Sequence, residues 1–381
     1  MEPVGALWVN LIRMVVVPLV AASVIGGVAR LGGAGRLGRL GLVSIGIFLA
    51  LGLTGILAGL ALAHVGLPLA PLSAEQTAAL RAAAASGAGE LGRTAGRVPG
   101  VAEFLGGLVP ANPVRAASDG ALLPLLVFSV LFGSAAAAVP EAQRRAIGDL
   151  AEAVVAALVR LIGWVMALAP LGVACLAAPV AARLGWAMLS SFGVFVVLVI
   201  AGFLAFTVVV FGALVRYGAR MGVGAFARAI APAYAVGFST TSSMASLPAM
   251  IEVAEEKLAV PPALAGFVLP LAATLNRPGS ALYQAVAVVF LAQLYGVHLG
   301  AAQYAAITVT LLPMTLSVYA GPGGSLLAMA PALAAVGLPL EGIGLLFGVD
   351  RLPDFFRSAT NVAGHLTVTA VVARGASAET A

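Results

Sequence analysis

The sequence predicts an all-α membrane protein with about seven transmembrane helices and two re-entrant helical hairpins, arranged as an inverted repeat. First, the chain of 381 residues is 61% hydrophobic and only 9% charged, whereas soluble domains carry about 25% charged residues. Second, its unbroken apolar runs are about 20 residues long, which is the length of a helix that crosses a bilayer. Third, two segments in the second half carry polar residues between two shorter apolar arms.

Plain apolar spans occupy the first half of the chain, at about 5–28, 41–65, 120–139, 150–178 and 188–215. The opening residues have no basic region before a cleavage site, so we expect a spanning helix there rather than a signal peptide. Short loops rich in arginine are typical of the cytoplasmic side, which places the loops around Arg36, Arg144 and Arg220 inside the cell. The polar stretch 66–117 is then an extracellular connection.

Residues 224–258 and 301–338 are predicted to enter the membrane and turn back. The sequences GFSTTSSMASLP and SVYAGPGGSLLAM stand in the middle of these segments, and arms of about 12–15 residues are too short to cross a ~30 Å core. At the tips, serine and threonine hydroxyls can bond the backbone groups that lipid leaves unpaired. Helix back-bonding by these hydroxyls or small-residue helix packing is the alternative, but two matching interruptions favour a transporter binding site.

The span 262–297 contains Asn276-Arg277-Pro278-Gly279, which predicts a broken helix because proline removes a hydrogen-bond donor and glycine loosens the turn. A break frees carbonyl groups that can bind a cation or a polar ligand. A simple proline kink is the alternative, and Asn276 at the break argues against it.

The last span carries Asp350, Asp354, Arg357, Asn361 and His365, spaced 4, 3, 4 and 4 residues apart. This spacing puts all five within a stripe about 80° wide on one helix face. Ionisable groups within a membrane are costly and usually functional. The planar fork of Arg357 suits a carboxylate, and Asp354 could accept an ammonium group. The alternative is a structural ion pair between Asp354 and Arg357, one turn apart.

Taken together, these motifs resemble the dicarboxylate/amino acid:cation symporter family, the glutamate–aspartate transporters. The serine-rich hairpin, the Asn-x-x-Gly break, the Gly-Pro-Gly hairpin and the D-x-x-x-D-x-x-R-S-x-x-N helix follow in family order, and the resemblance covers nearly the whole chain. Residue 1 stands just before the family's second helix, so either this branch lacks the first helix or the true start lies upstream. The resemblance implies a homotrimer whose transport core moves as an elevator against a scaffold.

The resemblance also implies site residues. The substrate-binding set is Ser242, Ser243, Ser280, Gly321, Gly323, Asp354, Arg357, Ser358 and Asn361. In this set Asp354 would take an amino group, and Arg357 the side-chain carboxylate of the substrate. The set for cation or proton coupling is Thr274, Asn276, Asp350, Asn361 and His365.

Several positions depart from the family pattern. Pro278 replaces a sodium-binding aspartate, Phe48, Leu51 and Gly52 replace three ligands of the same site, and His365 replaces the aspartate of another sodium site. Hard cations prefer oxygen ligands, so the sequence predicts coupling to H+ or to fewer Na+ than usual. An imidazole with an unperturbed pKa near 6.5 makes His365 a candidate proton carrier, and a neutral structural histidine is the alternative.

The sequence therefore predicts a multi-pass secondary transporter in the cell inner (plasma) membrane, for an acidic amino acid or a C4-dicarboxylate. A transport-inactive sensor or an anion channel on the same scaffold is the alternative. An enzyme is not expected, because the polar segments hold no nucleophile–base pair. We expect a small anionic substrate and membrane lipid as partners, no nucleic acid, and no cofactor or certain metal site apart from a coupling Na+ or H+.

We expect four regions along the chain. They are 1–65, with scaffold helices and the first helices of the transport domain; 66–117, the extracellular connection; 118–218, with scaffold helices and the start of the transport core; and 219–376, the transport core with hairpin 1, the broken helix, hairpin 2 and the last helix.

Overall fold

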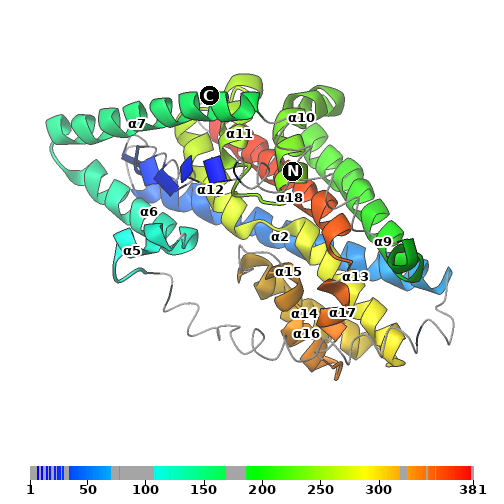
Figure 1. The fold of residues 1–381 in the computed structure, drawn as a ribbon. Helices are drawn as coiled ribbons and strands as arrows, with labels where there is room; N and C mark the ends of the chain where they lie inside the picture. The colour runs from blue at the N-terminus through cyan, green and yellow to red at the C-terminus, as the bar shows by residue number, and fades with distance from the viewer. Residues whose placement is uncertain are drawn as a thin grey trace.

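A computed structural model of the chain gives the arrangement shown in Figure 1. It describes residues 34–69, 109–119, 121–168, 186–317, 324–339, 342–347 and 349–378, with scattered positions among residues 7–29 and at 77 and 107. Every regular element in these ranges is a helix. The all-α fold class predicted from the apolar spans is therefore confirmed.

The first half of the described chain consists of long helices joined by short ones. These are α2 (Ala34–Gly66) with the short η1 (Leu67–Leu69), α5 (Pro113–Ser118), α6 (Leu122–Ala138), α7 (Glu141–Ala167) and α9 (Trp186–Phe206), which continues through the π-helical turns η2 (Thr207–Phe211) and η3 (Leu214–Gly218). Within the described residues, three helical stretches are long and apolar enough to cross a membrane: 39–66, 192–218 and 262–295. They coincide with three of the predicted spans.

The start of α7 corrects one prediction. The sequence EAQRR was expected to be a cytoplasmic loop before a span at 150–178, but Glu141 already begins the helix. Pro140 stands just before it, and Arg145 pairs with Glu141 one turn away, which stabilises an exposed first turn. Residues 169–178 lie outside the described ranges.

Hairpin 1 is interrupted where the sequence predicts. It consists of α10 (Val223–Thr240), a tip at 241–246, α11 (Leu247–Glu252) and the π-helical turn η4 (Val253–Lys257). The second arm packs against α10. The arms have 18 and 11 residues instead of two arms of about 12–15. Thr241 ends α10 in a left-handed conformation with φ of 51°.

The hydroxyls of hairpin 1 bond the backbone near its tip. Ser239 and Thr240 donate to the carbonyl of Val236 at 3.1 and 2.7 Å, and Ser246 donates to the carbonyl of Ser242 at 2.8 Å. These acceptors lie three or four residues earlier in the chain, so the bonds are the helix back-bonding that the sequence left as an alternative.

Hairpin 2 begins with α14 (Ala301–Ser317) and returns through α15 (Gly324–Leu327) and α16 (Ala330–Ala335). Helices α14 and α16 pack against each other, so the two arms lie side by side, as Figure 1 shows. Gly321 and Gly323, which the sequence assigns to the tip, lie outside the described residues.

The predicted helix break separates α12 (Pro262–Leu275) from α13 (Pro278–Tyr295). The last helices are α17 (Gly342–Phe347) and α18 (Arg351–Ala378). Helix α13 is almost wholly buried and packs along α2. A Cβ at Gly55 or Gly59 of α2 would lie 2.6 Å from the Pro278 carbonyl oxygen or 2.5 Å from that of Leu282. Only glycine permits this approach.

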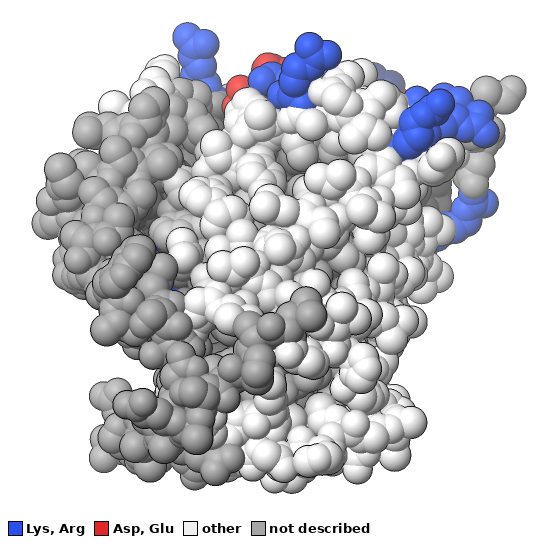
Figure 2. Space-filling model, turned by 90° about the vertical axis from the view of Figure 1, so that its right-hand side faces the viewer, with Lys and Arg blue, Asp and Glu red and all other residues white. Residues whose placement is uncertain are grey.

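The charged side chains on the face drawn in Figure 2 gather at one end of the molecule. Figure 2 shows Lys and Arg along the upper end, whereas the lower part of the described surface in that view is uncharged. The carboxyl end of the chain lies at the same end in Figure 1. Positive charge gathered at one end of a membrane protein is typical of its cytoplasmic side.

Candidate functional site

The centre of the candidate site is a buried ion cluster at the start of α18. Nη1 and Nη2 of Arg357 lie 2.8 and 3.0 Å from the two carboxylate oxygens of Asp350, and Nη2 lies 2.7 Å from Oδ1 of Asp354. Arg357 is 3% exposed and Asp350 is 7% exposed. The structure thus forms the ion pair that the sequence left as an alternative, and adds a two-pronged contact with Asp350.

Tyr283 of α13 completes the surroundings of the guanidinium. The Arg357 Cζ atom lies 4.6 Å from the centre of the Tyr283 ring, a cation–π contact that favours the charged group. The Tyr283 hydroxyl is buried beside this cluster. Two acids against one base leave a negative excess in this cluster.

A second, uncharged cluster joins α13, α18 and hairpin 2. The Gly279 N–H donates to Oδ1 of Asn361 at 2.9 Å, so Asn361 satisfies one of the unpaired donors at the start of α13. Nδ2 of Asn361 lies 3.4 Å from the Ser280 hydroxyl, and the Ser325 hydroxyl donates to Ser280 at 3.0 Å. This cluster holds the first turn of α15 against the broken helix.

The two clusters are neighbours, because Arg357 and Asn361 are one turn apart on α18 and Ser280 and Tyr283 are three residues apart on α13. The stripe predicted for α18 therefore faces the broken helix. Such a pair of clusters offers a guanidinium, carboxylates, hydroxyls and an amide, which together suit a small molecule with a carboxylate and a polar second group.

The remaining predicted site residues differ in their surroundings. Ser358 lies 3.5 Å from Oδ1 of Asp354 and so joins the ion cluster. The Ser242 hydroxyl accepts from the Ala245 N–H, and Ser243 is buried at the tip of hairpin 1. Thr274 donates to the carbonyl of Pro270 within its own helix at 2.8 Å.

A third group of polar side chains lies at the helix break. Asn276 is fully buried, and neither polar atom of its side chain has a hydrogen-bond partner among the described residues. His365 is also fully buried, and within the same ranges neither ring nitrogen has a partner. The Nε atom of Arg277 is buried and likewise unpaired in the described part of the chain.

The positions where the resemblance implies replaced sodium ligands are apolar or crowded here. Phe48 and Leu51 belong to the hydrophobic core, at 1% and 3% exposure. A Cβ at Gly52 would lie 2.9 Å from Oγ1 of Thr315 in α14. Pro278 opens α13, where its missing N–H costs nothing.

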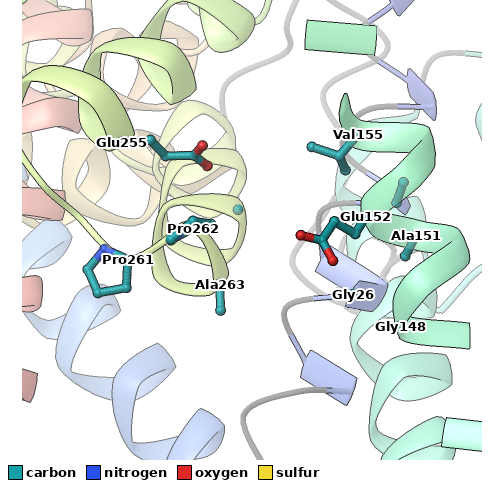
Figure 3. A pocket seen from close by; sticks show the side chains of 11 residues that line it. Gly26, Gly148, Ala151, Glu152, Val155, Glu255, Pro261, Pro262 and Ala263 are labelled. Atoms are coloured by element: carbon teal, nitrogen blue, oxygen red, sulfur yellow. The ribbon is translucent and has the colours of Figure 1, made fainter. Parts of the chain in front are cut away.

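A separate cavity of about 270 Å³ lies at the other end of α12. Figure 3 shows the carboxylates of Glu152 on α7 and Glu255 on hairpin 1 directed into it from opposite walls. Burial, followed by the charge of Glu256, raises the pKa of Glu255 above its ordinary value. The 14 residues of α12 put this cavity about 20 Å from the helix break.

Sequence reasoning missed Tyr283, Gln284, Ser325 and Arg277. Gln284 donates to the Ser325 carbonyl at 2.7 Å, which adds a second bond between α13 and α15. Arg277 could have been found by the rule applied to α18, because it too is a charged residue within an apolar span.

Comparisons with known proteins identify the family of this chain. A profile of the sodium:dicarboxylate symporter family matches residues 1–375. The chain is 32% identical over 374 residues to a proton/glutamate-aspartate symporter of Escherichia coli (strain K12), covering 98% of this chain and 85% of that protein. It is 31% identical over 376 residues to a proton/sodium-glutamate symport protein of Bacillus subtilis (strain 168), covering 98% and 86%.

A C4-dicarboxylate transport protein of Anaeromyxobacter sp. (strain K) is 30% identical over 375 residues, with 98% of this chain and 83% of that protein covered. The resemblance read from the motifs is confirmed by these matches. The family consists of integral membrane symporters, and the described apolar helices fit a multi-pass protein of the plasma membrane. The chain belongs to the sodium:dicarboxylate symporter family.

Proposed function

We propose that this protein carries an acidic amino acid or a C4-dicarboxylate through the membrane by an elevator movement of its transport core. The buried Arg357, held by Asp350 and Asp354 beside the uncharged cluster of Asn361 and Ser280, is the observation that carries this proposal. A guanidinium surrounded by protein is the group that best recognises a carboxylate. The printed names of three relatives, with glutamate, aspartate or dicarboxylate in them, support the substrate class.

Asp354 sets which acids can bind. Its Oδ1 accepts an N–H of Arg357, so an arriving carboxylate competes with it for the guanidinium. Once displaced, its carboxylate can accept the ammonium group of an amino acid. We therefore expect aspartate and glutamate to bind more tightly than succinate. In the same proposal the substrate site is completed by Ser242, Ser243, Ser358, Gly321 and Gly323.

Coupling is proposed to use H+ or fewer Na+ than usual. Phe48 and Leu51 are packed into the core and Pro278 starts α13, so these side chains offer a hard cation no oxygen. His365, Thr274 and Asn276 remain candidates for coupling. The first of the relatives above is named for protons and not for sodium, which supports this part of the proposal.

Uptake into proteoliposomes tests the proposal. Radiolabelled aspartate, glutamate and succinate would be offered under a sodium gradient or a proton gradient, each imposed alone. Wild-type vesicles should accumulate at least one acid, and Arg357→Ala should abolish this uptake. Arg228→Ala is the matched control, because Arg228 is exposed on α10. Uptake by Arg357→Ala at the wild-type level would contradict the assignment of the site.

A further inference from the structure

Arg277 is a charged side chain that neither cluster around α18 uses. It stands between the two halves of the broken helix, with Nη2 3.5 Å from the carbonyl of Ala273 and with Nε buried and unpaired among the described residues. A guanidinium in the middle of a membrane span is costly unless its surroundings carry negative charge. The structure must therefore supply that charge.

Two sources of negative charge surround Arg277. The helix α12 ends at Leu275, so its last carbonyl groups and the negative end of its dipole point at the break. Arg357 repels the guanidinium, and Asp354 attracts it, less strongly than Arg357 repels it. Next to it, the fully buried Oδ1 of Asn276 is an acceptor without a donor in the described residues. These surroundings are those of a cation site.

The charge balance of the core points the same way. Asp350, Asp354 and Arg357 together carry one net negative charge, and Arg277 brings the group to zero. An acidic substrate then adds its negative charge to a neutral group instead of a negative one. Transporters with broken helices commonly neutralise such charge with a bound Na+ or H+ at the half-helix end.

We propose that the guanidinium of Arg277 is the resident cation of the helix break and lets an acidic substrate bind without Na+. The charge is permanent, because arginine keeps its proton throughout the physiological range. It is also tethered, so it moves with the transport core and is not exchanged between the two sides of the membrane. This inference rests on the proposed function, since it concerns the binding of the same acid.

Equilibrium binding to the purified full-length protein tests this assignment. Radiolabelled aspartate, glutamate and succinate would be titrated in sodium-free choline chloride and in sodium chloride. Wild-type affinity should agree in the two salts within about twofold. Arg277→Met, which keeps an unbranched side chain without the charge, should lower the affinity in choline chloride at least about tenfold. Sodium chloride or millimolar guanidinium chloride should restore it, and Arg277→Lys should bind in choline chloride.

The matched control is Arg228→Met. Arg228 also donates to the carbonyl four residues before it, at 3.3 Å from Gly224, but it is exposed on α10, so its loss should leave the affinity unchanged in both salts. Size-exclusion elution shows whether Arg277→Met is folded, and recovery by guanidinium excludes a misfolded protein.

Three results would overturn the inference: a wild-type protein that requires Na+, an Arg277→Met variant with wild-type affinity in choline chloride, or an Arg277→Lys variant that needs Na+. The first and third of these do not depend on the folding of the methionine variant. In all three cases the acid still binds, so the proposed function survives. A wild-type protein that binds none of the three acids in either salt would instead refute the proposed function, and this inference with it.

Discussion

Replacing single glycines of α2 by alanine tests how the broken helix is held. Gly55 faces the Pro278 carbonyl and Gly59 faces the Leu282 carbonyl of α13, whereas a Cβ at Gly46 would meet nothing within 4 Å. The same substitution on the same helix thus adds a methyl group against backbone at two positions and into open space at the third. Gly46→Ala is therefore the matched control.

The structure gives the size of the effect. Ordinary contact begins at 3.4 Å, so a Cβ at Gly55, 2.6 Å from the Pro278 oxygen, requires a shift of about 0.8 Å. Backbone cannot yield like a flexible side chain, and overpacking of this kind costs about 1–3 kcal/mol. Alanine recovers about 0.5–1 kcal/mol of helix stability at any of these positions. Gly55→Ala and Gly59→Ala should therefore destabilise the fold, and Gly46→Ala should stabilise it.

Gly55→Ala should also impair transport most, because the next residue after Pro278 is bonded to Asn361. A Cβ at Gly279 would already lie 3.0 Å from the Arg357 carbonyl oxygen, so the start of α13 has little room to move. Thermal unfolding in detergent and uptake into proteoliposomes measure the two effects. Melting temperatures of Gly55→Ala and Gly59→Ala at or above that of wild type would refute this reasoning.

Two further predictions concern carboxylates. Asp354→Asn should weaken the binding of aspartate at least about tenfold, which is the loss expected for one hydrogen bond to a charged group. The binding of succinate, which has no ammonium group, should not weaken. Equal losses for the two acids in a competition assay would contradict a contact between Asp354 and the ammonium group. Burial raises the pKa of Glu255 in the folded protein. Below the ordinary pKa of 4.5 this group therefore does not lower the free energy of unfolding, but that free energy falls as the pH rises through the raised pKa. Glu255→Gln should therefore have a higher melting temperature than wild type at neutral pH and the same melting temperature below pH 4.5. Parallel curves of melting temperature against pH would be evidence against a cost of burying the charged carboxylate.

The sequence predicted the positions of the interruptions well, because proline, glycine and clustered hydroxyls mark them within long apolar runs. The break before Pro278 and the tip after Thr240 lie where the residues indicate. Helix ends were predicted less well: α7 starts at Glu141, since a local ion pair extends it beyond the apolar run.

Contacts between distant residues could not be predicted from spacing. The stripe on α18 indicated that Asp350 and Arg357 share a face, but the ring of Tyr283 against Arg357 depends on how α13 packs. The double role of Asn361, which accepts from Gly279 and lies near Ser280, likewise requires the close approach of residues 82 and 81 positions apart in the chain. Neither contact leaves a periodic signal in the sequence.

The hydroxyls at the tip of hairpin 1 have a consequence for the energy of motion. Ser239, Thr240 and Ser246 all donate to carbonyl groups of the same hairpin, so these bonds travel with it. Hydroxyls that are hydrogen-bonded within their own segment lose no hydrogen bonds to water when that segment moves from water into an apolar environment. The tip can therefore move without breaking any of these bonds. Desolvation of these hydroxyls then adds nothing to the free-energy barrier for the movement.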